Sequence, residues 1–123
     1  MQVTALVDDD PGVSYDEDLA DRIRGLIAGE PNVSEQTMFG GLAFLVGGNM
    51  AVAASGQGGL MVRVDPDETG VLLAKPHVQP FEMRGRAMRG WLRIDAEGVR
   101  TKRQLDPWVR RGVAYARSLP SKR

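Results

Sequence analysis

The stretch MFGGLAFLVGGNMAVAA at residues 38–54 decides the fold. It contains two short apolar runs separated by Gly47-Gly48-Asn49, the pattern of two antiparallel strands joined by a tight glycine turn. Alternate residues from Leu42 to Val46 point to opposite faces of such a strand, and all of them are apolar. Both faces of this hairpin are therefore expected to be covered, or one face is expected to meet a partner.

Three further strands are predicted from short connections and apolar runs. Residues 60–64 return along the hairpin after the glycine-rich turn at 55–59, and residues 81–83 and 88–94 form two more strands joined by a polar turn. Residues 33–39 are expected only to lead into the central hairpin. Because short connections favour neighbouring antiparallel strands, the sequence predicts a five-stranded antiparallel sheet.

Capping residues mark the first two of three helices. Ser14 and Glu17 fit a capping box at the start of the first helix, and Gly29 is the expected stop. Asp65 followed by Pro66 opens a short second helix, which is expected to end near residue 74.

The third helix has the clearest amphipathic pattern. Thr101 and Gln104 form its capping box. Apolar residues then recur on one face at Leu105, Trp108, Val109, Gly112, Val113 and Ala116. The resulting order, α-βββ-α-ββ-α, predicts a two-layer α+β fold in which three helices pack on one antiparallel sheet.

The length of 123 residues suits a single domain. We expect that domain over residues 14–119, a flexible tail at 1–13 and a short C-terminal tail at 120–123. No run approaches the roughly 18 apolar residues of a membrane span, and no secretory leader precedes the first helix. The absence of cysteine excludes disulfides and thiol chemistry and fits a cytoplasmic location.

The charges balance overall but are segregated along the chain. Of the 16 acidic and 16 basic side chains, residues 1–78 hold twelve acids and four bases, and residues 79–123 hold four acids and twelve bases. Such asymmetry predicts either a polarised surface or two halves that interleave in space, so that the polarity averages out.

A set of short strings follows a fixed order over roughly residues 14–119. They are Tyr15 to Ala20, Met38 to Phe44, Asn49-Met50, Val62 to Val64, Pro80 to Met83, Met88 to Trp91, and Trp108 to Ala116. Together they resemble the N-terminal domain of the TfoX/Sxy family, which are bacterial regulators of competence. The resemblance implies a single-domain member with a two-layer α+β fold similar to secretion chaperones. For some members it also implies activation of transcription beside a cyclic-AMP receptor protein.

The string Phe39-Gly40-Gly41 is the first candidate for a partner- or ligand-binding site. Glycines at the end of a strand let another backbone come close. The alternative is a turn or bulge in which Phe39 anchors the core. These glycines lack the strand-to-helix context of a phosphate-binding loop, which argues against nucleotide binding by that route.

Basic residues around Trp91 form the second candidate. Arg89, Trp91 and Arg93 alternate onto one strand face, and arginines flanking an exposed tryptophan suit phosphate contact and base stacking. Alternatively, Trp91 packs inward and the arginine stems cover it. Other basic residues lie nearby in sequence: Arg84, Arg86, Arg100, Lys102 and Arg103.

Five methionines lie on or beside the expected strands: Met38, Met50, Met61, Met83 and Met88. Methionine is flexible, so these side chains either fill the core or form an adaptable protein-binding surface. A sheet that three helices cover only in part also leaves a face or an edge for a homodimer.

His77 is the only histidine, and no catalytic residue or metal ligand is assigned. Without a second histidine or a cysteine, we expect no metal and no cofactor. A triad of Ser55, His77 and an aspartate is conceivable, but a surface histidine is the simpler interpretation because triads are defined by geometry.

We therefore expect a non-enzymatic domain that acts through protein partners, with a role in regulating transcription or competence. The alternative is a nucleic-acid-binding module that uses the basic second half of the chain. A small enzyme is the third and weakest hypothesis, and a deep pocket with convergent polar groups would be needed to support it.

Overall fold

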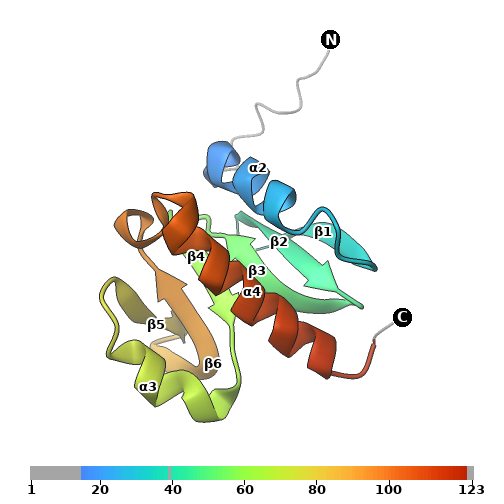
Figure 1. Ribbon diagram of the computed structural model, residues 1–123. Helices are drawn as coiled ribbons and strands as arrows, with labels where there is room; N and C mark the ends of the chain where they lie inside the picture. Colours follow the sequence, from blue (N-terminus) through green and yellow to red (C-terminus); the bar gives the residue numbers. More distant parts are fainter. Residues whose placement is uncertain (1–14, 39, 122–123) are drawn as a thin grey trace.

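The computed structural model describes residues 15–38 and 40–121. In the described residues, three α-helices lie on one face of a six-stranded antiparallel sheet with the strand order β1-β2-β3-β4-β6-β5 (Figure 1). The strands are β1 (Val33–Met38), β2 (Gly41–Val46), β3 (Asn49–Ala54), β4 (Leu60–Arg63), β5 (Val78–Met83) and β6 (Arg86–Ile94). The helices are α2 (Glu17–Leu26), α3 (Thr69–Leu73) and α4 (Lys102–Ser118), and the short 3-10 turns are η1 (Pro66–Glu68) and η2 (Ala96–Val99). The predicted α+β class and the three helices are confirmed.

The prediction of five strands is wrong, because residues 33–38 form an additional edge strand. β1 pairs with β2 along its whole length, from Val33 opposite Val46 to Met38 opposite Gly41. Its four inner side chains are polar and exposed, since an edge strand has one neighbour and little to bury. The sequence therefore lacks the apolar alternation that identifies strands.

The glycine turn of the central hairpin is as predicted, but it is shorter. Gly47 and Gly48 have φ values of 60° and 84° and form a two-residue turn, and Asn49 already belongs to β3. The Asn49 side chain is 2% exposed and its amide donates to the carbonyl of Pro120 at 2.9 Å. This bond ties the segment that follows α4 to the hairpin.

The first helix begins later than the sequence predicted. Ser14 lies outside the described residues, and Asp16 is the N-cap, with its carboxylate accepting from the Leu19 N–H at 3.1 Å. An aspartate in this place both caps the free amide and complements the positive end of the helix dipole. The helix also ends at Leu26 instead of continuing to Gly29.

The third helix is confirmed in detail. Thr101 and Gln104 form the capping box, and the buried residues are those of the predicted face, with Trp108 partly buried at its margin. A Cβ built on Gly112 would lie 2.5 Å from the Ala51 carbonyl oxygen, so α4 packs closer to β3 than any side chain there would allow. We call the face that receives α2, α3 and α4 the covered face.

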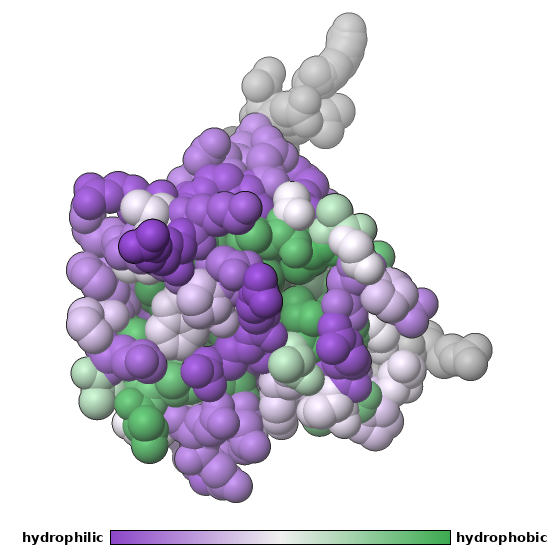
Figure 2. All heavy atoms as spheres, in the orientation of Figure 1, coloured by the Kyte–Doolittle hydropathy of each residue, from purple (hydrophilic) through white to green (hydrophobic). Residues whose placement is uncertain are grey.

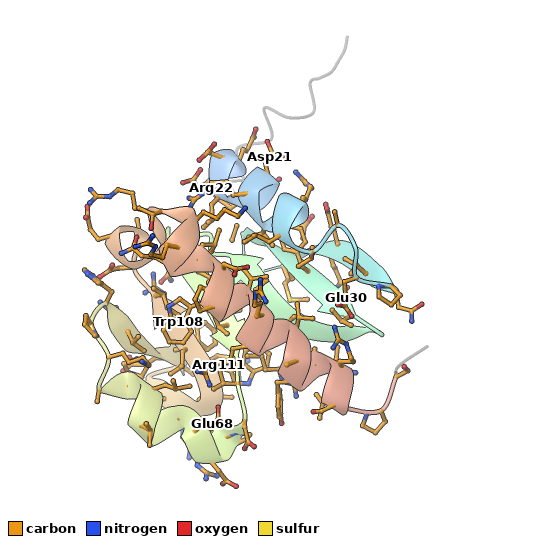
Figure 3. All side chains as sticks on the ribbon, viewed as in Figure 1. Asp21, Arg22, Glu30, Glu68, Trp108 and Arg111 are labelled. Carbon is orange, nitrogen blue, oxygen red and sulfur yellow. The ribbon has the colours of Figure 1, made fainter. Side chains whose placement is uncertain are left out.

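The two oppositely charged halves of the sequence interleave in space. Arg111 on α4 points toward Glu68 at 2.9 Å (Figure 3), and Arg89 bonds Asp67 at 2.9 Å. Arg117 likewise pairs with Glu30. Each pair joins a base from residues 79–123 to an acid from residues 1–78, so the segregation along the sequence is offset on the surface. Within the described part of the chain, no helix is long and apolar enough to cross a membrane.

Candidate functional site

The sheet face opposite the helices carries a second, smaller hydrophobic cluster. Its buried members are Ala43, Met50, Ala53 and Met61, and the partly buried residues against it are Met38, Leu45, Phe81 and Trp91. All eight come from strands, and no helix of the described chain contributes to the cluster. We call this surface the open face.

A groove with a volume of about 470 Å³ runs over the open face. It is lined by Gln36, Met38, Leu45, Gly48, Met50, Met61, Arg63, Phe81, Met83, Met88 and Trp91, and all six strands contribute to it. Strands lie about 4.8 Å apart, so the outer two of a flat six-stranded sheet would be about 24 Å apart. Because Met38 of β1 and Met83 of β5 line one groove, the sheet must curl toward the open face.

The five methionines predicted as either core filler or adaptable surface all line this groove, which we call the methionine groove. Met50 and Met61 form its floor, with exposures of 7% and 6%, and Met88 stands at the rim with 37% exposed. Unbranched thioether side chains can repack around different occupants, so the groove is suited to recognising an apolar shape.

Of the described residues, Arg63 is the one with a charged side chain that lines the groove, and the sequence-based selection of site residues missed it. Its guanidinium lies 5.0 Å from the ring centre of Trp91 and 5.7 Å from that of Tyr115. Within the described residues no carboxylate pairs with it. The available signal was the interruption of the apolar run at residues 60–64 by a single arginine.

The predicted alternation of Arg89, Trp91 and Arg93 is broken at Gly90. Gly90 has a φ of 89°, and its N–H donates to the buried hydroxyl of Thr69 at 2.9 Å. The pairing of β5 with β6 shifts register in the same region. Arg89 consequently bonds Asp67 in η1, whereas Trp91 lines the methionine groove, so the structure does not bring these two together.

Trp91 and Arg93 do share the open face. Trp91 is half-buried, with its ring centre 6.4 Å from that of Phe81 and tilted by 48°. Arg93 donates to the carbonyl of Gly58 at 3.3 Å. Trp91 is thus packed between Phe81 and the guanidinium of Arg63 on the open face, where it stays partly exposed.

The glycines of the first candidate site have a structural use. Gly40 has a φ of 76°, and a Cβ on Gly41 would lie 2.4 Å from the Ala54 carbonyl oxygen. The pair therefore turns the chain between β1 and β2 and lets β3 come close. Phe39, the third residue of this prediction, lies outside the described residues.

A basic turn stands beside the groove. Arg84 and Gly85 have φ values of 55° and 78° and connect β5 to β6, immediately after Met83 in the groove wall. Arg84 and Arg86 are both exposed, and neither has an ion-pair partner in the described chain. With Arg63, they make the electrostatic character of this end of the open face positive.

The covered face is different in character. Figure 2 shows the outer surface of the helices on this side as mostly hydrophilic, with hydrophobic residues gathered in a hollow between α2 and α4. That hollow has a volume of about 410 Å³ and is lined by Leu26, Ile27 and Val109 among others, but its rim carries the Glu30–Arg117 ion pair. Its charges are already matched, so it is a weaker candidate than the methionine groove.

The conceivable triad is not assembled. His77 Nδ1 lies 3.0 Å from Asp95 Oδ1, but the same oxygen accepts from the Gly98 N–H, and the Ser55 hydroxyl accepts from the Gln57 N–H. These contacts brace loops. Among the described residues, no group of three or more His, Cys, Asp or Glu side chains is arranged to hold a metal ion.

One ion pair fastens the edge strand to the helices. Arg24 of α2 donates two hydrogen bonds to Glu35 of β1, at 2.7 and 2.9 Å. These bonds, together with the charge of Arg24, lower the pKa of the Glu35 carboxyl despite an opposing contribution from burial. The pairing holds β1, whose Gln36 and Met38 form one wall of the methionine groove.

One comparison bears on identity. A family model described as the TfoX N-terminal domain matches residues 25–116 of the 123-residue chain. No curated protein matches the chain.

Proposed function

The chain belongs to the TfoX N-terminal domain family, and from this premise we propose that it is a non-enzymatic, cytoplasmic binding module that acts on a protein partner through the open face of its sheet. The observation that carries the proposal is the methionine groove, an apolar concavity of about 470 Å³ to which all six strands contribute. A sheet face that the domain's own helices leave uncovered, and that is apolar, is a surface prepared for a partner.

The chemistry of the groove supports recognition over catalysis. Its polar side chains are Arg63 and Gln36, and the rest of the lining is Met, Leu, Phe, Trp and Gly. Acid–base catalysis needs a group that can gain and lose a proton near neutral pH, and nucleophilic catalysis needs an activated Ser, Cys or Lys. Among the residues that the structure describes, neither kind lines this groove.

The family suggests what the partner does. Because the resemblance implies, for some members, activation of transcription, we propose a component of the transcription apparatus as the partner and a regulatory role for the complex. A module of this size works by contact, holding a second protein in place or blocking its surface. The groove supplies the contact, and the partner supplies any catalytic activity.

The proposal is tested by site-specific crosslinking in the cell of origin. A photoreactive residue replaces Met38 or Met83 in the groove, and in a control it replaces Val71 on α3, which is 75% exposed and away from the open face. We expect one transcription protein, identified by mass spectrometry, to crosslink from both groove positions and not from position 71. Equal crosslinking from all three positions, or none from the groove, would contradict the proposal.

A nucleic-acid-binding module is the second candidate, favoured by one observation. Arg84 and Arg86 stand exposed and unpaired in the described chain beside a face that contains Trp91. If this turn binds phosphates, retention of single-stranded DNA or RNA on filters should fall steeply with salt, and Arg84→Gln with Arg86→Gln should reduce the slope by about two. Absence of retention at low salt would remove this candidate.

A further inference from the structure

The guanidinium of Arg63 is held in place without a countercharge. It lies against the rings of Trp91 and Tyr115, at 5.0 and 5.7 Å from their centres, and these contacts fix its position at the groove. Its five N–H donors have no acceptor among the described residues. An arginine presented in this way, half-buried and beside apolar walls, is ready to bind a carboxylate from outside the domain.

The remaining charge around the groove has the same sign. Among the described residues no acidic side chain lines it, and the turn between Met83 and Met88 adds Arg84 and Arg86. The nearby Glu82 is not part of the lining, and it shares a separate hollow with Phe81 and Arg93. An occupant is therefore apolar where it enters the groove and negative where it meets Arg63 and the turn.

This one-sided charge argues against a second copy of the chain as the occupant. A twofold dimer brings the same patch of both copies together, so Arg63 and the Arg84–Arg86 turn would face their own equivalents. Like charges in a contact with little water are strongly unfavourable. Acids must come from a different surface or a different protein.

We propose that the methionine groove receives an amphipathic helix of a partner protein, with an apolar stripe on the methionines and a carboxylate on Arg63. The inference rests on the function proposed above and specifies the chemistry of its partner. The sheet curls toward the open face, and a cylinder about 10 Å across fits such a concave surface. Flexible methionines are suited to the i, i+3, i+4 and i+7 anchors of a helix bound in a groove.

The inference is tested by selecting peptides from a random display library on the folded protein. Peptides of about 16 residues are used, because a helix of that length is about 24 Å long and spans the sheet. Selected peptides are synthesised, and their binding is followed by tryptophan fluorescence and by circular dichroism. We expect enrichment of sequences with apolar residues at helical spacing and Asp or Glu beside them, and a gain of helix on binding.

Substitutions at Arg63 decide whether the charge is responsible. Arg63→Gln should weaken the selected peptides by about ten- to hundredfold, the factor for losing one charge-assisted hydrogen bond, and Arg63→Lys should restore part of the loss. Arg103→Gln is the matched control, since it removes an exposed arginine from α4 on the other face, and it should leave affinity unchanged. Near-ultraviolet circular dichroism confirms that each variant is folded.

Each other outcome overturns the inference in a recognisable way. No enrichment, peptides that bind extended, or basic peptides would contradict the acidic helix. So would binding that Arg63→Gln leaves unchanged, or displacement of the peptides by single-stranded DNA or by decanoate at a lower concentration than the peptide itself.

If selected peptides lack acids but no longer bind the Met88→Glu variant, the open face still binds protein and only the charge inference fails. If Met88→Glu also has no effect, the proposed function falls with it.

Discussion

Along β4, Leu60 and Val62 enter the covered face and are fully buried, whereas Met61 and Arg63 on the same strand enter the open face. One strand thus presents stiff, branched side chains to the helices and flexible or charged ones to the other side. Branched side chains have few rotamers and specify one packing arrangement, but methionine adapts to several. The difference indicates that the covered face packs against the domain's own helices, whereas the open face is suited to a partner from outside the domain.

The covered face also contains a close approach of a helix backbone to the sheet. Gly112 on α4 lies over Ala51 on β3, and the absence of a side chain at position 112 sets the distance between helix and sheet. Such a contact tolerates one geometry only. The comparison can be tested by changing matched positions on the two faces, beginning with the pair for which the largest change in the free energy of unfolding is expected.

The largest difference is expected between Phe44→Ala and Leu45→Ala, which are neighbours on β2. Phe44 is 1% exposed in the covered-face core, and its loss should destabilise the domain by about 3–5 kcal/mol through lost burial and a cavity. Leu45 is half-buried on the open face and should cost only about 1 kcal/mol. Urea denaturation followed by circular dichroism measures both. Equal losses would mean that the open face is part of the core.

The second test concerns the close approach of α4. Gly112→Ala places a Cβ 2.5 Å from the Ala51 carbonyl oxygen and 2.8 Å from the Val52 side chain, so the helix must move outward. We expect a loss of about 1–3 kcal/mol from overpacking. Gly25→Ala is the control, since nothing lies within 4 Å of its added Cβ in α2. The control should gain up to about 1 kcal/mol from helix propensity, and a gain at both positions would show that α4 is loosely seated.

The difference between the two faces also explains which elements of the fold could be predicted from the sequence. The covered-face residues of α4 were all predicted, because a helical stripe and a capping box are local signals. β1 was missed, because VSEQTM is a polar edge strand without alternation. An edge strand is defined by the neighbour it pairs with, and pairing is not a local property.

The candidate site was predictable only in part. The five methionines were recognised, but which of them would meet depended on the curl of the sheet and on shifts of register in β2–β3 and β5–β6. Arg89 was expected beside Trp91, and Gly90 instead turned it toward Asp67. A register shift of one residue reverses the faces of all later residues in a strand. The strands were therefore easier to predict than the set of side chains that meet at the site.

The third test concerns the ion pair that holds β1 to the covered side. The pKa of Glu35 is lowered in the folded state by Arg24. A group with a lowered folded-state pKa stabilises the fold above its unfolded pKa of about 4.3, and this contribution disappears as the pH falls through the folded value. Both side chains are over a third exposed, so the effect should stay below about 1 kcal/mol.

Denaturation at a series of pH values from about 7 down to about 3 measures this effect. The difference between the native protein and Glu35→Gln should be largest at neutral pH and vanish in acid. Glu82→Gln is the control, since Glu82 is exposed and has no ion pair in the described chain, and its difference from the native protein should be smaller throughout. A Glu35→Gln variant as stable as the native protein at neutral pH would show that β1 is held mainly by its backbone pairing with β2.

The smallest change in stability, and the most informative, is expected at the rim of the groove. Met88 is 37% exposed and Val71 is 75% exposed, so Met88→Glu and Val71→Glu should each change the free energy of unfolding by no more than about 0.5 kcal/mol. Only Met88→Glu places a negative charge beside the surface we propose for an acidic partner. It should abolish crosslinking from the groove and lower the affinity of selected peptides, while Val71→Glu leaves both unchanged. If Met88→Glu leaves stability unchanged but abolishes binding, the open face is a binding surface. Unchanged binding in Met88→Glu would show that the open face is not the binding surface.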